Sequence, residues 1–406
     1  MSKRNNKIKI NNCNICNRKK LEKVIDLGYH TPADTFINKR YKNLILPKIK
    51  LICNFCKSCS QVQLRHTLIN QYRYNEFKYS YTSSNSSISR NYLNDYFHFV
   101  KKNINFNNKN ILEIGSNDGY LLNKFKNKTT KLFAYEISSE MHSILKKKKI
   151  NSINLPFEEI PKYEIQLKQK KFNTIICNNV LNHCHNLNKF FKNIYSILSD
   201  NGIFFLEVPY APWMIKNSKF ELIYLEHINY FSLNGLNKLS IQNNLYINKV
   251  NFFNYHGKMI RLCISKRKKI DKKLKIIIYK EKKYFSSRLT FRSFMKIIES
   301  KKTRFLNKIL KIKLNQNSII AAVGAGAKTI SLINYFDLNN KFIDFITDNS
   351  KLKIGKFVPN RNIEIKSDIF FKKHENIYAF FPTWNISKFL KNKIRKINKN
   401  IKFISY

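Results

Sequence analysis

The chain has 406 residues, of which 43% are hydrophobic, and this is enough apolar material to fill the cores of two or three domains. A wholly disordered protein is therefore excluded. The 76 lysines and arginines against 25 aspartates and glutamates give a net charge of +51, which taken alone suggests nucleic acid or an anionic membrane as a partner. The lysines are, however, spread over almost every segment, among many Asn and Ile residues. We interpret the charge as a compositional bias and do not expect nucleic acid as the partner, although it would attract a substrate that carries phosphate.

The sequence has no apolar run of the roughly 18 to 20 residues that a membrane-spanning helix requires. The start, MSKRNNKIKI, is basic but lacks the apolar stretch of a secretory signal. We therefore expect a cytoplasmic protein without a membrane partner.

The first part of the chain, residues 1–76, predicts a small module held together by a metal. Two C-x-x-C pairs have the spacing that gives zinc a tetrahedral set of thiolates: Cys13, Cys16, Cys56 and Cys59. The insert between them, residues 17–55, is longer than the 15 to 20 residues of common zinc ribbons. Cys53 also forms a C-x-x-C pair with the third of these cysteines, but we favour the set above and treat Cys53 as a spare thiol. Iron, or cysteines that bind no metal, are the alternatives.

The second part, residues 77–268, predicts an alternation of strands and helices, which indicates βαβ units and a parallel sheet. The expected strands are 110–115, 131–137, 172–180 and 201–210. The expected helices are 91–104, 119–127, 140–148 and 187–200, the last closed by Gly202.

The third part, residues 269–406, predicts a second αβ domain. It begins with a long basic helical stretch around 276–302, continues through a strand, glycine turn and helix at 318–336, and adds a strand at 341–350. The glycine turn contains Gly324, Gly326 and Lys328. Asp348 follows it at a spacing that is also found in nucleotide-binding sites. One short turn is weak evidence, so a purely structural sheet remains the favoured interpretation.

A glycine turn in the second part predicts a ligand site. The segment EIGSNDG lies between a strand and a helix and includes Glu113, Gly115, Asn117 and Gly119. Glycines there let the backbone approach a ligand, and the helix start offers free amides. The next strand ends at Glu136, at the distance from which a carboxylate can accept hydrogen bonds from ribose hydroxyls.

This turn, together with Glu136 and the FEEI segment at 157–160, resembles the S-adenosylmethionine site of class I methyltransferases. The resemblance implies S-adenosylmethionine as cofactor.

A second group of polar residues follows the last of these strands. Tyr224, Glu226 and His227 lie together in the sequence. Asn179 lies at the carboxyl end of the strand at 172–180, and His183 follows four residues later, where open parallel sheets place their ligand crevice. Two tyrosines from the end of the metal module, Tyr79 and Tyr81, can reach the same place. A base and hydrogen-bond donors are the groups that methyl transfer to carbon requires.

With these motifs the chain resembles the three-domain, zinc-containing sugar C-methyltransferases, which methylate C3 of nucleotide-linked 4-keto-deoxysugars. The matching segments are the two cysteine pairs, YSYTSSNSS, EIGSNDG, NNVLNH, the YLEH-NYFS block, HGKMIR, GAGAK and DNSKLKIGKFVPN. The resemblance implies an α/β fold with a zinc-binding module, a central class I Rossmann-like domain and a second Rossmann-like domain that closes over the nucleotide-sugar.

The resemblance also implies roles for the residues. His227 is the expected general base, with Tyr224, Glu226, His183 and Asn179 around the sugar. The cofactor is expected at the glycine turn and Glu136, and zinc at the four paired cysteines. Tyr79, Tyr81 and Lys328 are expected substrate contacts.

The sequence departs from the family at several positions: Leu225, Lys258, Met259, Asn17 and Ser60. Leu225 replaces a histidine beside the expected base, and none of these changes removes an expected catalytic group. Two other functions stay open. The charge and cysteines also suit an RNA methyltransferase or a zinc-containing nucleic-acid-binding protein, and a third possibility is a non-catalytic remnant.

Overall fold

The computed structural model describes residues 7–33, 35–69, 82–84, 86–105, 107, 109–159, 171–269, 271–287, 289–315 and 317–406. Its central sheet has the order β13-β14-β11-β10-β7-β8-β9. The strands β7 to β11 run parallel, and β13 and β14 form an antiparallel hairpin at one edge. The strands are β7 (Asn110–Ile114), β8 (Lys131–Tyr135), β9 (Asn151–Ile153), β10 (Phe172–Asn178), β11 (Leu198–Pro209), β13 (Tyr246–Tyr255) and β14 (Gly257–Ser265).

Helices pack on this sheet because the strands are apolar on both faces, as parallel strands require. The helices are α1 (Ser87–Asn103), α2 (Tyr120–Asn123), α3 (Ser139–Lys147), α5 (Leu187–Ile197), α6 (Ala211–Lys216) and α7 (Leu233–Ile241). Two expected boundaries were wrong. The helix predicted at 119–127 is a single turn, α2, and the helix predicted at 187–200 ends at Ile197, so that Gly202 lies inside β11. The residues after Ile197 continue a buried apolar pattern that suits a strand equally well.

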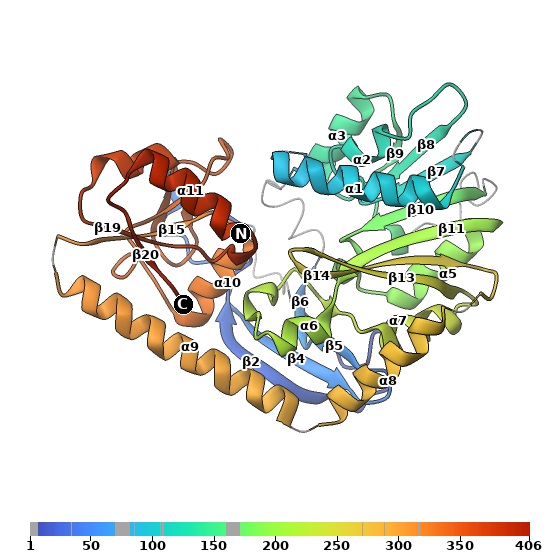
Figure 1. Cartoon of the computed structure of the whole chain (residues 1–406), viewed down its shortest axis with the longest axis horizontal. Coiled ribbons are helices and arrows are strands. Elements are labelled where there is room, and N and C mark those ends of the chain that lie inside the picture. Colours follow the sequence, from blue (N-terminus) through green and yellow to red (C-terminus); the bar gives the residue numbers. More distant parts are fainter. Residues whose placement is uncertain are drawn as a thin grey trace.

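The C-terminal sheet has the order β20-β19-β15-β16-β18-β17-β3. Its strands are β15 (Ile319–Val323), β16 (Phe345–Thr347), β17 (Lys356–Val358), β18 (Ile363–Lys366), β19 (Ile377–Phe380), β20 (Lys402–Ile404) and β3 (Ile37–Asn38). Its helices are α10 (Ala327–Phe336) and α11 (Ser387–Ile397). The basic stretch predicted as one helix is two helices, α8 (Lys272–Ser286) and α9 (Leu289–Lys313), and α9 runs along the base of the molecule (Figure 1).

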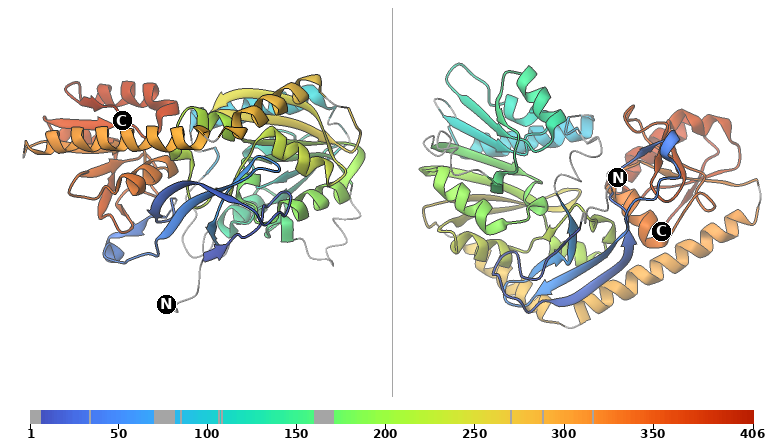
Figure 2. Two further views of the ribbon diagram at one scale, coloured as in Figure 1. Left: turned by 90° about the horizontal axis from the view of Figure 1, so that it is seen from below. Right: turned by 180° about the vertical axis from the view of Figure 1, so that it is seen from behind.

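The N-terminal part forms a four-stranded sheet of order β12-β5-β4-β2 beside a small β1-β6 pair. Its strands are β1 (Lys7–Lys9), β2 (Glu22–His30), β4 (Ile49–Cys56), β5 (Gln61–Leu64), β6 (His66–Leu68) and β12 (Asn229–Tyr230). This sheet lies below and between the two larger domains, as both views from front and back show (Figures 1 and 2).

The three parts exchange strands. β3 comes from the N-terminal part but pairs with β17 of the C-terminal sheet, and β12 comes from the central part but pairs with β5 of the N-terminal sheet. Helix α10 packs against β2 and the short 3-10 helix Phe220–Leu222, so it is buried from Lys328 to Phe336. The three parts therefore meet along α10, where Ser331 donates to the Ile223 backbone oxygen and Asn334 donates to Thr31.

None of the helices in the described part of the chain has the length and apolar character needed to cross a lipid bilayer.

Candidate active site and metal centre

The glycine turn lies at the carboxyl end of β7, where the backbone takes a left-handed conformation at Gly115 (φ +70°), Asn117 (φ +50°) and Gly119 (φ +73°). A Cβ at Gly115 would lie 2.2 Å from Cγ2 of Val180, so this position has no room for a side chain. The turn therefore brings the backbone close to Val180, just after the end of β10.

Glu136 lies beside this turn at the end of β8. One carboxylate oxygen accepts a hydrogen bond from the Asn117 N–H (2.7 Å), and the other accepts one from the Ser138 N–H (2.9 Å). Burial raises the pKa of Glu136, and the amide hydrogen bonds oppose that shift. A carboxylate can accept about four hydrogen bonds, so hydrogen bonds from ribose hydroxyls are compatible with this geometry.

Glu113, the last polar residue of β7, is 3% exposed. Its Oε2 atom has no hydrogen-bond partner in the described part of the chain. Burial raises the pKa of this carboxyl well above its usual value, and the nearby Asp118 and Glu136 raise it further. The buried site therefore favours the neutral form of Glu113 over the carboxylate.

Ser83 and Ser84 of the YSYTSSNSS segment contact the glycine turn, a contact that the sequence analysis did not predict. The Ser83 N–H donates to the side-chain oxygen of Asn117 (2.8 Å), and the hydroxyls of Ser83 and Ser84 donate to the Asp118 carboxylate. In the sequence, the run of serine and threonine residues in this segment is the feature that could have indicated this contact. Tyr79 and Tyr81 lie outside the described residues.

The second group of predicted residues comes together between β10 and β12. The Tyr224 hydroxyl lies 2.6 Å from His227 Nε2, and the ring centroids of His183 and His227 are 4.7 Å apart. His183 Nδ1 lies 2.6 Å from the backbone oxygen of Glu226. A carbonyl oxygen only accepts, so His183 carries its proton on Nδ1 and, when neutral, presents Nε2 as an acceptor.

Glu226 and Asn179 connect this group to its surroundings. The Glu226 carboxylate is 3% exposed and accepts a hydrogen bond from the Ala33 N–H (2.6 Å), which ties it to the N-terminal part. Asn179 is left-handed (φ +56°), and its amide donates to the Asn178 side chain and to the Tyr92 hydroxyl (3.4 Å). The sequence analysis missed Tyr92, which no motif marked.

Lys328 lies in the first turn of α10, where the C-terminal domain contacts the central domain. Its ammonium donates to Asn385 Oδ1 (2.6 Å) and lies 3.3 Å from His256 Nδ1 and 5.1 Å from the centre of the Trp384 ring. Lys219 lies 4.3 Å from the same ring. Burial lowers the pKa of Lys328 to about 7.

The turn before α10 repeats a feature of the first turn. Gly324 has φ +91°, and the Asp348 carboxylate accepts a hydrogen bond from the Ala325 N–H (2.9 Å), as Glu136 does from Asn117. A Cβ at Gly326 would meet nothing within 4 Å, so the start of α10 is open at this glycine.

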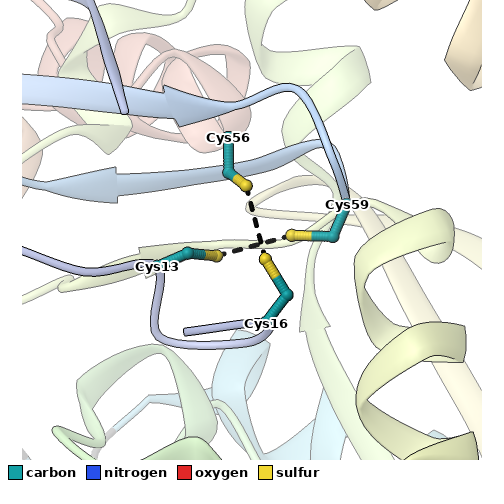
Figure 3. Close-up of side chains that lie close together, drawn as sticks. All are labelled: Cys13, Cys16, Cys56 and Cys59. Atoms are coloured by element: carbon teal, nitrogen blue, oxygen red, sulfur yellow. Dashed lines mark hydrogen bonds between the residues drawn. The ribbon is translucent and has the colours of Figure 1, made fainter. Parts of the chain in front are cut away.

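The structure brings together the four predicted metal-binding cysteines, Cys13, Cys16, Cys56 and Cys59, whose sulfur atoms all lie within 4.8 Å of one another (Figure 3). The cluster is largely buried, and four converging thiols fit a tetrahedral zinc ion. Asn17 and Ser60, which follow the two pairs, are both left-handed (φ +58° and +57°). Left-handed backbone of this kind favours glycine, and asparagine is among the residues that tolerate it. Cys53 is buried in the hydrophobic core and does not belong to the cluster.

Comparison with known proteins gives three family matches in chain order. Residues 13–72 match a model described as "Putative zinc binding domain", residues 88–250 match "Methyltransferase domain", and residues 254–406 match "C-methyltransferase C-terminal domain".

Two curated relatives are informative. The C-methyltransferase NovU of Streptomyces niveus is 21% identical over 336 residues, which cover 81% of this chain and 79% of that protein. A ribosomal RNA small subunit methyltransferase A of Mycoplasma mobile is 36% identical over 89 residues, which cover 21% of this chain and 35% of that protein. A solved structure, the magnesium protoporphyrin IX methyltransferase of Synechocystis, has a TM-score of 0.36 and 11% identity and covers 44% of this chain and 84% of its own.

The sheet order, the glycine turn with its carboxylate and the family matches define an S-adenosylmethionine-dependent methyltransferase with a zinc-binding domain. Because all three domain types occur in the expected order, the chain belongs to the three-domain, zinc-containing C-methyltransferases.

Proposed function

We propose that this enzyme transfers the methyl group of S-adenosylmethionine to C3 of a nucleotide-linked 4-keto-deoxysugar. The contact between the Tyr224 hydroxyl and His227 Nε2, 2.6 Å, carries the proposal. In a ketone, the carbonyl oxygen and the acidic proton on the adjacent carbon are close neighbours. A hydrogen-bond donor and a base at this separation can therefore act on both groups of the substrate at once.

His227 removes the C3 proton, and the electron pair forms the enolate whose oxygen is O4 of the sugar. The Tyr224 hydroxyl donates to this oxygen. Tyr224 suits the role better than His183, because a neutral His183 bonded through Nδ1 to the Glu226 carbonyl offers an acceptor to the substrate. C3 then forms a bond to the methyl carbon, the carbon–sulfur bond breaks, and S-adenosylhomocysteine leaves.

The cofactor is held by the glycine turn in this proposal. The backbone at Gly115, Asn117 and Gly119 faces the amino-acid and sugar portions, and Glu136 accepts hydrogen bonds from the ribose hydroxyls. The four cysteines hold zinc as a structural ion, since four protein thiolates leave no open coordination position for a substrate.

The nucleotide part of the substrate is expected at the start of α10. Lys328 and Lys219 place two cationic side chains around Trp384, and the open turn at Gly326 offers backbone amides to a diphosphate. The C-terminal match to a C-methyltransferase domain supports a substrate that contacts this part of the chain.

The test uses methyl-labelled S-adenosylmethionine and a panel of nucleotide-linked 4-keto-deoxysugars, with mass spectrometry to locate the label. Wild-type enzyme is expected to place the label on sugar carbon, and His227→Ala to reduce the rate by about 10² to 10⁴. His98→Ala removes an exposed histidine of α1 and serves as the matched control. Label on RNA and on no sugar would overturn the proposal in favour of an RNA methyltransferase.

A further inference from the structure

His256 occupies the single-residue turn between β13 and β14, and its position is fixed on both sides. Gly257 has φ +107°, and a Cβ there would lie 2.5 Å from the ring of Trp213. Trp213 in turn contacts Trp384, with ring centroids 5.9 Å apart. The tip of the hairpin is therefore wedged between the central and C-terminal domains.

The neighbours of His256 place it between the two halves of the proposed substrate site. The preceding Tyr255 stacks on Tyr92 with ring centroids 3.6 Å apart, and the Tyr92 hydroxyl hydrogen-bonds Asn179. On the other side, His256 itself contacts Lys328.

The contacts of His256 fix which ring nitrogen carries the proton. The ammonium group of Lys328 can only donate, so the amide oxygen of Asn385 faces Lys328 at 2.6 Å. The NH₂ group of Asn385 then faces His256 Nδ1 at 3.3 Å. Lys328 also lies 3.3 Å from Nδ1. Both neighbours donate, so Nδ1 is the acceptor and the neutral ring carries its proton on Nε2.

The ring is neutral under ordinary conditions. Burial lowers the pKa of His256 well below its usual value of 6.5, and the charges of Lys328 and His227 lower it further. Both hydrogen-bonded neighbours of His256 contact Nδ1. Within the described residues Nε2 has no hydrogen-bond partner, so its N–H is available to a ligand.

We propose that His256 is a further substrate-binding residue, which donates its Nε2–H to a substrate oxygen between the reacting carbon and the diphosphate, and that Asn385 and Lys328 act as positioning residues that fix this tautomer. The inference rests on the function proposed above, since it needs a substrate that extends from His227 to Lys328. Under this proposal, Asn385 and Lys328 of the C-terminal domain determine that His256, at the tip of the β13–β14 hairpin of the central domain, donates a hydrogen bond through Nε2.

The first measurement is nitrogen NMR of ¹⁵N-histidine-labelled protein bound to S-adenosylhomocysteine, with His256→Asn used to assign the signal. Wild-type His256 is expected to be the Nε2–H tautomer, and its signal is expected to move when a nucleotide-linked 4-keto-deoxysugar is added. Asn385→Asp is the matched variant, because a carboxylate of the same shape only accepts and therefore requires a proton on Nδ1. This variant is expected to show a protonated Nδ1.

The second measurement compares two replacements of the ring. His256→Gln keeps an amide N–H near the place of Nε2, whereas His256→Asn places its amide near Nδ1. We expect the asparagine variant to raise the KM for the sugar substrate about 10-fold, the effect of one lost hydrogen bond, with kcat changed less, and the glutamine variant to recover most of this loss.

The outcomes separate this inference from the proposed function. If methyl transfer to sugar carbon occurs but the His256 signal does not move with substrate, or the two variants raise KM equally, the inference is wrong and the function stands. If the signal moves but no sugar carbon is methylated, the proposed reaction is wrong and the binding role stands. A wild-type Nδ1–H tautomer would overturn the inference outright.

Discussion

The hydrogen bond between Tyr224 and His227 joins two residues that are three positions apart in the sequence, so a short segment supplies both a base and a donor. A variant that lacks the Tyr224 hydroxyl but keeps the aromatic ring tests whether this hydroxyl stabilises the enolate. Tyr224→Phe is expected to lower kcat by about 10² to 10³, the usual effect of losing one donor to a developing oxyanion. Steady-state kinetics measure the change, with Tyr279→Phe, which alters an exposed tyrosine of α8, as the control. An unchanged kcat would exclude Tyr224 from the reaction.

Lys328 predicts a pH dependence of substrate binding. Its pKa, lowered by burial to about 7, means that the side chain is a cation below this pH and neutral above it. The KM for a diphosphate-containing substrate is therefore expected to rise between pH 6 and pH 8. Lys328→Met is expected to raise KM and to remove this pH dependence; an equal slope in both proteins would show that another group titrates.

The same shift has a defined sign for stability. Between pH 7 and the usual lysine pKa of 10.5, the unfolded chain binds more protons at this residue than the folded chain. Lys328 therefore makes the folded state more stable as pH rises through this window, and destabilises it most below pH 7.

At the scale of single elements, the β13–β14 turn is sensitive to one methyl group. Gly257→Ala would add both left-handed strain and a clash with Trp213, whereas Gly355→Ala adds a similar strain (φ +81°) with nothing within 4 Å. We expect Gly355→Ala to cost about 1–2 kcal/mol of unfolding free energy. Gly257→Ala is expected to cost more and to raise KM as well. Chemical denaturation and kinetics of the two variants provide the comparison; equal losses would mean that Trp213 moves aside freely.

The sequence predicted the elements whose pattern is local. The buried runs of β7, β8 and β10 and the glycine turn after β7 could be recognised because neighbouring residues alone define them. The site residues of the YLEH block were predicted for the same reason, although their roles came from the family resemblance.

The two exchanged strands could not be predicted. Each has only two residues, too few for a periodicity, and each pairs with a strand far away in the sequence. The contact of His256 with Lys328 was missed for a related reason, because it depends on how two domains pack. The start of β11 at Leu198 was missed because a buried apolar run suits a helix end as well as a strand.

For the whole molecule, the cysteine cluster connects the N-terminal part to the central domain. The backbone oxygen of Ile15, between Cys13 and Cys16, accepts hydrogen bonds from Asn188 of α5 (2.9 Å) and Gln242 after α7 (2.7 Å). The N-terminal sheet also holds β12, which begins two residues after His227. Loss of the metal should therefore affect the active site as well as the small domain.

We expect Cys56→Ser to reduce the zinc content from about one ion per chain to near zero and to lower both the melting temperature and the activity. Cys53→Ala is the matched control, since Cys53 lies three residues earlier on β4 but outside the cluster. It should keep its zinc. Metal analysis and thermal unfolding test both variants, and zinc loss in Cys53→Ala would show that the set of ligands is different.

The pairing of β3 with β17 also constrains how the protein is made. About 320 residues separate Ile37 from its partner Phe357. At a synthesis rate of about 5–20 residues per second, β3 waits roughly 16 to 64 s after leaving the ribosome before its partner exists. During this interval the central domain can already fold, so the edge of the C-terminal sheet is completed only by a segment made long before it. A chain cut between the domains would leave the C-terminal half without its edge strand β3.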